Sequence, residues 1–91
     1  MDKPLDQLKR NCVLVLHYEE PMKTTIEVLE YLYQRHVVFE SAFLLNSSSD
    51  VATLHIFCSL EKDRTKQLQF QLVKLKNMLR VDILCNNKRI D

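Results

Sequence analysis

Hydrophobic residues recur with two different periods along this chain, and each change of period marks the start of another element. The first apolar run, Cys12 to Leu16, contains no polar residue and is β-branched at Val13 and Val15. Short, continuously apolar runs of this kind are typical of strands that are covered on both faces. The pattern therefore predicts a buried strand from Asn11 to Leu16.

A helical period follows this strand. Pro21 suits the first position of a helix, where its missing N–H is not needed. After it, apolar side chains recur every three to four residues: Met22, Ile26, Leu29, and Leu32 or Tyr33. Polar residues fill the other positions and are expected to face water: Lys23, Glu27, Glu30 and Gln34. We expect an amphipathic helix that ends near Arg35 and His36, before the β-branched pair Val37 and Val38.

The next two elements are predicted strands that are joined by a polar turn. The first runs from residue 37 to 46, and alternate residues share one face: Val37, Phe39, Ser41, Phe43 and Leu45. The cluster NSSSD, residues 46–50, supplies the turn. The second strand, residues 51–59, has Ala52, Leu54, Ile56 and Cys58 on one face and Val51, Thr53, His55 and Phe57 on the other.

A second helical period and a short strand complete the pattern. The apolar stripe contains Leu68, Leu72, Leu75 and Leu79, and is widened by Phe70 and Met78. The polar side carries Lys66, Gln67, Lys74 and Lys76. Asp63 or Ser59 is the expected cap at the start of this helix. The final strand is RVDILC, Arg80 to Cys85.

The resulting order is βαββαβ, which is that of the α+β ferredoxin-like fold. This fold has a four-stranded antiparallel sheet, in the order 4-1-3-2, with two helices on one face. The other face is then bare, and we expect His55, Phe57, Val13 or Val15, and Phe39 or Phe43 to contribute to it. A bare apolar face and the long second strand at the sheet edge both favour a homodimer.

Length and charge restrict the class of protein further. The chain of 91 residues is long enough for one domain, here residues 11–85 between polar tails at 1–10 and 86–91. Its formal net charge of +1 argues against strong nonspecific attraction to nucleic acid or anionic membranes. No apolar run approaches the length of about 18–20 residues that spans a membrane, and the polar N-terminus lacks the apolar middle of a signal peptide. We therefore expect a cytoplasmic protein.

The sequence offers little catalytic or metal-binding chemistry. Cys12, Cys58 and Cys85 are widely spaced within apolar runs, so we expect three buried, reduced thiols. His55 and Cys58 project to opposite faces of a strand and do not chelate one ion. Adjacent carboxylates, Glu19 and Glu20, are best explained by the helix dipole. We predict neither a catalytic residue, nor a metal site, nor a cofactor.

Nucleic-acid binding is the alternative that the topology itself suggests, because RNA-recognition domains share it. Those domains stack bases on aromatic side chains of the two central strands. His55 and Phe57 are suitably placed on one of them, but the other, CVLVL, has no aromatic residue. A phosphate site at the first helix is also poorly supported, since such sites usually rely on glycine and this chain contains none.

One segment resembles a known family. RHVVFES, residues 35–41, is similar to the RGYNIES-type segment that follows the first helix in ACT domains of the small regulatory subunit of acetolactate synthase (acetohydroxyacid synthase). Arg35, Glu40 and Ser41 match it. The stretch from Leu54 to Leu84 also resembles that family's strand, helix and last strand, with the closest matches at Gln71, Leu72, Lys74, Leu75 and Val81. The resemblance spans about residues 11–85 and implies an ACT domain that dimerises edge to edge.

The resemblance also locates a ligand site. In that family a branched-chain amino acid, typically valine, binds between protomers through a Gly and an Asn in the first strand-to-helix turn and an Asn before the Glu-Ser pair. The matching positions here are Lys23, Glu20 and Val38, and a shift of one residue puts Met22 at the Gly. None of these residues keeps the family's binding chemistry.

The functional prediction is a non-enzymatic regulatory ACT-domain protein. It is expected to form a homodimer, to contact a large catalytic subunit of acetolactate synthase in branched-chain amino acid biosynthesis, and to respond little to valine. One alternative is an ACT-type sensor of another small molecule, a cationic or polar one held by Glu19, Glu20 and Lys23. The other is a nucleic-acid-binding ferredoxin-like domain.

Overall fold

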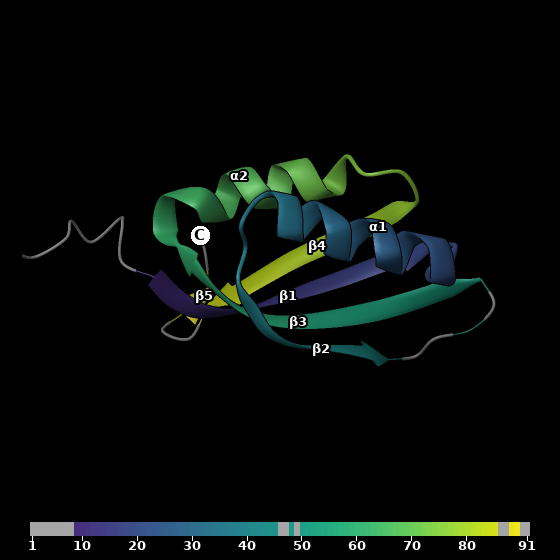
Figure 1. Ribbon diagram of the computed structural model, residues 1–91, viewed down its shortest axis with the longest axis horizontal. Coiled ribbons are helices and arrows are strands. Elements are labelled where there is room, and N and C mark those ends of the chain that lie inside the picture. The colour runs from purple at the N-terminus through teal and green to yellow at the C-terminus, as the bar shows by residue number, and fades with distance from the viewer. Residues whose placement is uncertain (1–8, 46–47, 49, 86–87, 90–91) are drawn as a thin grey trace, which may run out of the picture.

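The computed structural model describes residues 9–45, 48, 50–85 and 88–89, and the statements below refer to these residues. The elements are β1 (Lys9–Glu19), α1 (Pro21–Gln34), β2 (Phe39–Leu45), β3 (Val51–Glu61), α2 (Lys62–Val73), β4 (Met78–Cys85) and β5 (Lys88–Arg89). The strands form one antiparallel sheet in the order β2-β3-β1-β4-β5. Both helices cover the same face of the sheet (Figure 1). The predicted ferredoxin-like fold and its strand order are confirmed.

The central strands are buried on one face only. In β1 the residues that face the helices are fully buried (Cys12, Leu14, Leu16 and Tyr18), whereas Val13, Val15 and His17 are half-buried on the open face. The same alternation runs along β3. The prediction that β1 is covered on both faces is therefore wrong, because both helices lie on one side and every second residue of the apolar run faces outward.

Helix α1 buries the predicted Leu32 and packs the predicted Leu29 against the core, but the rest of its buried stripe differs from the prediction. Its buried residues are Thr24, Val28 and Leu32, while Met22, Ile26 and Tyr33 are exposed. The Thr24 hydroxyl donates a hydrogen bond of 2.7 Å to the Glu19 carbonyl oxygen, so this polar side chain is satisfied inside the core. The helix is consequently rotated, and the two apolar residues of its first turns, Met22 and Ile26, lie on its outer flank.

Strand β2 contains a bulge that changes which residues share a face. Phe39 pairs with Cys58 and lies on the helix side, whereas Ser41 pairs with Phe57 on the open face. The pairing shifts between Phe39 and Ser41, and an extra residue in one strand moves all later side chains to the other face. The predicted single face from Val37 to Leu45 is therefore wrong, and only its last three residues share the open face.

The second helix is shorter than predicted. It ends at Val73, and β4 begins at Met78, so Met78 and Leu79 belong to the strand. A turn that contains Asn77 in the left-handed conformation (φ 71°) separates them. Neither Asp63 nor Ser59 caps α2, because the residue at its start is Glu61, and Phe70 is exposed rather than part of the core.

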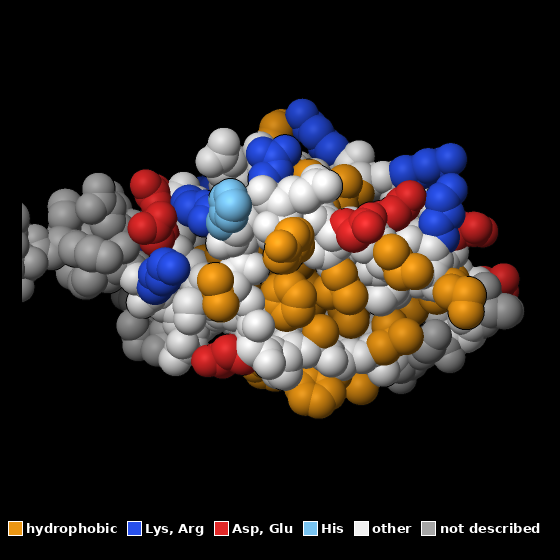
Figure 2. All heavy atoms as spheres, in the orientation of Figure 1, with side chains coloured by type: hydrophobic (Ala, Val, Ile, Leu, Met, Phe, Trp, Pro, Cys, Tyr) orange, Lys and Arg blue, Asp and Glu red, His pale blue; other side chains and the backbone are white. Residues whose placement is uncertain are grey.

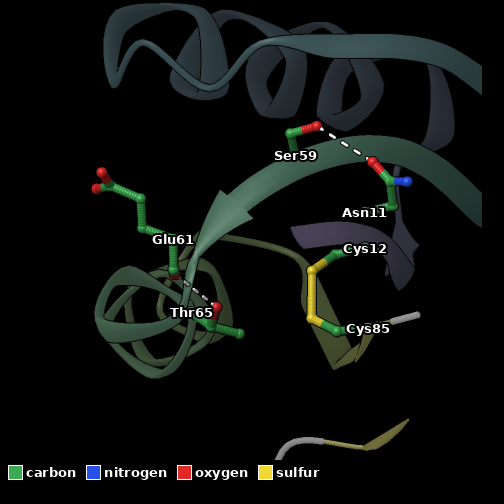
Figure 3. Close-up of a disulfide and its surroundings, with 6 residues drawn as sticks. All are labelled: Asn11, Cys12, Ser59, Glu61, Thr65 and Cys85. Carbon is green, nitrogen blue, oxygen red and sulfur yellow. Dashed lines mark hydrogen bonds between the residues drawn. A yellow bond between two sulfur atoms is a disulfide. The ribbon is translucent and has the colours of Figure 1, made fainter. Parts of the chain in front are cut away.

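The cysteines differ most from the prediction. Cys12 and Cys85 form a disulfide, and only Cys58 is a free, buried thiol (Figure 3). Antiparallel pairing of β1 with β4 places Cys12 directly opposite Cys85, with 4.0 Å between their Cα atoms. The two residues are 73 positions apart in the sequence, and cysteine spacing alone does not reveal which strands will pair.

The folded part extends slightly beyond the predicted domain bounds. Strand β1 starts at Lys9, inside the expected N-terminal tail, and β5 lies inside the expected C-terminal tail, where it pairs with β4. Residues 1–8 lie outside the described part of the chain, as do Asn46, Ser47 and Ser49 of the predicted turn. No helix in the described ranges is long and apolar enough to cross a membrane.

Candidate functional site at the turn between β1 and α1

The turn between β1 and α1 is held by main-chain hydrogen bonds from two other connections. The Glu19 N–H donates to the Asn77 carbonyl oxygen (2.9 Å), and the Glu20 N–H donates to that of Asp50 (3.3 Å). Glu20 itself has the left-handed conformation, φ 55° and ψ 62°. Glycine adopts this conformation most readily, but the chain contains none. The turn therefore gathers residues from three separate connections at one end of the sheet.

Side chains behind the turn fix it further. Thr24 joins the Glu19 carbonyl to the Asn77 side chain, whose Nδ2 donates to the Thr24 hydroxyl oxygen (3.3 Å). Next to it, the Tyr18 hydroxyl is hydrogen-bonded to the Thr25 hydroxyl. Burial raises the pKa of Tyr18, and the hydrogen bond with Thr25 partly opposes this shift. Tyr18 therefore keeps its proton at neutral pH and supports the turn from below.

A hollow of about 390 Å³ opens beside the turn. Six residues line it: Glu19, Glu20, Lys23, Asp50, Lys76 and Asn77. Three carboxylates stand against two ammonium groups, which leaves an excess of one negative charge. Such a mixed lining suits a polar or cationic small molecule, whereas the aliphatic side chain of valine would find few apolar partners in it.

The structure brings together only some of the residues that the sequence analysis placed here. Glu20 and Lys23 line the hollow, and so does Glu19. Met22 and Val38 do not line it, and both are largely exposed, by 85% and 65%. Asp50, Lys76 and Asn77 were not predicted to lie here, because they come from connections that are distant in the chain.

A second candidate surface lies where α1 borders the β2 edge of the sheet. We define the α1–β2 patch by its exposed apolar residues, Met22, Ile26, Tyr33 and Leu44. Leu44 pairs with the buried Leu54 and so faces the helix side, yet it is 47% exposed because no helix covers this edge. Figure 2 shows hydrophobic side chains gathered over α1 and β2. Patches of this kind mark contact sites for other proteins.

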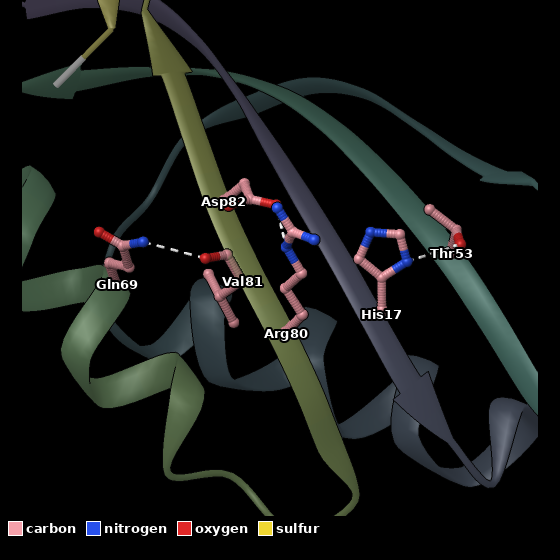
Figure 4. Close-up of polar contacts among 6 residues, drawn as sticks. All are labelled: His17, Thr53, Gln69, Arg80, Val81 and Asp82. Carbon is pink, nitrogen blue, oxygen red and sulfur yellow. Dashed lines mark hydrogen bonds and ion pairs between the residues drawn. The ribbon is translucent and has the colours of Figure 1, made fainter.

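The open sheet face is partly apolar and partly polar. Phe43 and Phe57 meet edge to face, with 5.8 Å between their ring centroids, close to Val13 in the register of the strands. Towards the other end, the polar residues are paired among themselves (Figure 4). His17 Nδ1 lies 3.0 Å from the Thr53 hydroxyl, and Arg80 Nε donates to Asp82 Oδ2 at 2.8 Å. The predicted contributions of Val13, Val15, Phe43, His55 and Phe57 to this face agree with the structure, whereas Phe39 lies on the other side.

The histidines and carboxylates of the described residues are not arranged as metal ligands. Among the described residues, no three His, Cys, Asp or Glu side chains are grouped so that they could hold a metal ion. His17 and Asp82 are each engaged by a neighbouring side chain. The two features that the described residues do form are the polar hollow beside the first turn and the α1–β2 patch.

Solved structures are similar to this chain, among them the following two. The first is the ACT domain from GTP pyrophosphokinase of Chlorobium tepidum, with a TM-score of 0.71, 15% sequence identity, and coverage of 86% of this chain and 89% of that one. The second is the C-terminal domain of the MgtC protein from Mycobacterium tuberculosis, with a TM-score of 0.65, 8% identity, and coverage of 93% and 94%. No protein-family model matches the sequence, and no curated protein matches it. At these identities the likeness shows the fold, and the chain has the fold of an ACT domain.

Proposed function

We propose that this protein is a non-enzymatic regulatory ACT-domain protein that acts as a homodimer and controls its target by protein–protein contact. The observation that carries the proposal is the α1–β2 patch beside an open strand edge. β2 is the outermost strand on its side of the sheet, and three consecutive residues of it, Phe43, Leu44 and Leu45, are exposed by 52%, 47% and 42%. An exposed, apolar edge strand is a liability in a monomer unless another strand pairs with it.

A second copy of the chain fits this edge. Two β2 strands that pair antiparallel about a twofold axis would satisfy the outer main-chain N–H and C=O groups of both. The same axis would bring the two α1 helices together, and Met22, Ile26 and Leu44 would be removed from water on both sides. At about 25 cal/mol per Å² of apolar surface, burial of these side chains favours association.

The partner that we propose is the large catalytic subunit of acetolactate synthase. The support comes from the sequence, where RHVVFES and the second half of the chain resemble the small regulatory subunits of that enzyme. We further propose that valine does not control the association, because the matching ligand positions hold Glu20, Met22, Lys23 and Val38. A carboxylate such as Glu20 would repel the carboxylate of an amino acid.

The test combines three measurements on the full chain. Sedimentation equilibrium should give a dimer, and the catalytic subunit of the source organism should show higher activity when this protein is added. Calorimetry with valine, leucine and isoleucine should show no heat of binding. Micromolar affinity for any of them would refute the valine-insensitive part, and unchanged activity of the catalytic subunit would refute the proposed partner.

A second candidate function is sensing of a polar or cationic small molecule. It is favoured by the hollow itself, in which Glu19, Glu20 and Asp50 face Lys23 and Lys76. A thermal-shift screen of polyamines, basic amino acids and other polar metabolites should then reveal a ligand whose effect is lost in Glu20→Ala and Lys23→Ala. Thr53→Ala on the open face serves as the control, because it lies outside the hollow and should keep the response.

The proposed location is the cytoplasm. In that compartment disulfides are rare, and those that occur are usually transient or redox-sensing. Cys12–Cys85 would accordingly be a bond that responds to redox conditions. Alkylation of free thiols in intact cells, followed by peptide mapping, tests this location, since a fully oxidised pair in unstressed cells would point to an oxidising compartment.

A further inference from the structure

The three cysteines of the chain lie in one row across three neighbouring strands. In the strand register, Cys12 of β1 is directly opposite Cys58 of β3 on one side and Cys85 of β4 on the other. All three are buried on the helix side of the sheet, with exposures of 2%, 2% and 7% in that order. Figure 3 shows the bond that joins Cys12 and Cys85 across their strands. Cys12 is therefore the middle member of the row and has a cysteine on each side.

The sheet geometry places both neighbours within bonding reach of Cys12. The Cα atoms of Cys12 and Cys85 are 4.0 Å apart, which fits the closely spaced, non-hydrogen-bonded type of antiparallel pair. The N–H and C=O of a strand residue point to the same neighbouring strand, so those of Cys12 point toward β3. Cys12 and Cys58 are then a hydrogen-bonded pair, with Cα atoms about 5.5 Å apart. This separation lies within the usual range for disulfides of about 4.4–6.8 Å, whereas the 4.0 Å between Cys12 and Cys85 is shorter than that range.

Cys58 and Cys85 do not have this relation to each other. They are separated by the whole of β1, and neighbouring strands are about 4.8 Å apart, which puts the two cysteines about 10 Å from each other. A direct bond between them would require the sheet to open. Any rearrangement within the row therefore has to pass through Cys12.

A hollow gives access to the row, and the surroundings of Cys58 keep most of its thiol protonated at neutral pH. A hollow of about 380 Å³ opens at this end of the sheet, lined by the three cysteines together with Asn11, Val13, Glu40, Phe57 and Leu84. Burial, followed by the nearby Glu40 carboxylate, raises the pKa of Cys58 to about 11. Since only the thiolate attacks a disulfide, this shift slows exchange without preventing it.

We propose that Cys58, Cys12 and Cys85 form a thiol–disulfide exchange site in which the Cys12 sulfur is bonded in turn to Cys85 and to Cys58. Cys58 loses its proton to solvent, and its thiolate attacks Cys12 Sγ. The Cys12–Cys85 bond breaks, its electron pair stays on Cys85 Sγ, and Cys85 takes up a proton. One disulfide and one thiol are present before and after, so no oxidant or reductant is consumed. This chemistry is independent of the regulatory function proposed above.

The exchange would move the cross-link from one side of β1 to the other. Before it, β1 is tied to β4; after it, β1 is tied to β3, and the end of β4 carries a free thiol. Cys85 is the most accessible of the three cysteines and neighbours β5 in the sheet. The released Cys85 would be the group presented to a small thiol or disulfide, such as glutathione, that enters the hollow.

The test uses the full-length protein and three serine variants in buffers of reduced and oxidised glutathione. Samples are quenched in acid, alkylated and mapped by mass spectrometry. Cys58→Ser should form Cys12–Cys85, and Cys85→Ser should form Cys12–Cys58. Cys12→Ser should form no bond within the chain and retains both outer thiols, which makes it the matched control.

Disulfide mapping of the wild-type protein tests the proposal even if a variant fails to fold. Across the same series of redox buffers, it should yield both disulfides, with Cys12–Cys58 at about 1% or more of the linked peptides. Recovery of Cys12–Cys85 alone in the wild type would overturn the proposal. Two free thiols in a folded Cys85→Ser would also overturn it, because Cys12 and Cys58 would then fail to bond. A Cys58–Cys85 bond in Cys12→Ser, as abundant as Cys12–Cys58 in the wild type, would overturn it as well, because exchange would not need Cys12.

Discussion

The two helices cover the same face of the sheet, but their outer sides are built differently. α1 exposes Met22, Ile26 and Tyr33 along one stripe, at spacings of four and seven residues. α2 exposes fewer large apolar residues, Phe70 and Val73, near its end, and the Phe70 ring has the Lys74 ammonium 4.0 Å from its centroid. This contrast is what the proposed homodimer requires, with the α1 side at the contact and the α2 side facing water.

The inner sides of the same helices are alike. Each helix buries a threonine in its first turns. In α1 the Thr24 hydroxyl donates to the Glu19 carbonyl, and in α2 the Thr65 hydroxyl donates to the Glu61 carbonyl. Each also buries a leucine near its end, Leu32 or Leu72, both fully inaccessible to water. The inner sides of the two helices therefore serve the core in the same way, and the helices differ on their outer sides.

The largest expected effect concerns the inner sides. Leu32→Ala in α1 and Leu72→Ala in α2 should each lower the free energy of unfolding by about 2–5 kcal/mol, because each leaves a cavity in the core. Urea denaturation followed by circular dichroism measures both. Met22→Ala is the control from the outer side of α1 and should change the stability of the monomer by no more than about 0.5 kcal/mol. A loss for Met22→Ala as large as that for Leu32→Ala would contradict the assignment of inner and outer sides.

Much of this fold follows from the pattern of the sequence. The alternation along residues 51–59 and the spacing of Leu68 and Leu72 are enough to predict the elements and their order, because period reflects burial. The burial of Thr24 was not predictable in the same way, since its hydroxyl is satisfied only by the particular turn at Glu19. Hydrophobicity alone therefore placed Met22 in the core, and Thr24 was not among the residues expected there.

The candidate site and the disulfide depend on contacts between distant parts of the chain. Asp50 and Asn77 reach the first turn through main-chain hydrogen bonds to Glu20 and Glu19, and no local pattern encodes those contacts. Likewise, the position of Cys12 opposite Cys85 is set by how β1 and β4 pair. The bulge in β2 is a third case, because one unpaired residue reverses the faces of all that follow.

The second prediction concerns the outer sides directly. Ile26 on α1 and Phe70 on α2 are similarly exposed, by 56% and 63%. If α1 meets the partner protomer, Ile26→Glu should raise the dissociation constant of the homodimer about 30-fold or more, which corresponds to about 2 kcal/mol. Phe70→Glu should leave it unchanged. Sedimentation equilibrium over a range of protein concentrations gives both constants.

The two glutamate variants control for each other, since they add the same charge at equally accessible positions. Far-ultraviolet circular dichroism confirms that each remains folded. Equal weakening by both would show that charge alone disrupts the dimer, and weakening by Phe70→Glu only would place the contact on α2. Either result would contradict the proposal that the dimer contact lies on the α1 side and not on the α2 side.

A smaller effect should separate the two buried threonines. Valine matches threonine in shape but lacks the hydroxyl, so Thr24→Val leaves the Glu19 carbonyl and the Asn77 side chain each without this partner. We expect it to cost about 1–3 kcal/mol, and Thr65→Val, which removes one such bond, about 1 kcal/mol. Chemical denaturation compares them, and Thr24→Ser, which keeps the hydroxyl, should recover most of the difference. Equal costs for the two valine variants would mean that the hydrogen bond from the Asn77 side chain contributes nothing to the stability of the turn.

The smallest effect concerns an arrangement that the two helices share. Each has an aromatic ring with a cation four residues later: Arg35 lies 4.8 Å from the Tyr31 ring centroid, and Lys74 lies 4.0 Å from that of Phe70. At such accessible positions, Arg35→Ala and Lys74→Ala should each lower the free energy of unfolding by about 0.5 kcal/mol. Lys74→Ala also removes the ammonium group from the Phe70 ring. The variant therefore tests whether Lys74 alone keeps the exposed Phe70 from contacting another protein. Sedimentation of Lys74→Ala should show the same dimer constant as the wild type, since one isolated ring is too small a surface to recruit a partner. Stronger self-association of this variant would show that the contrast between the helices depends on a single lysine.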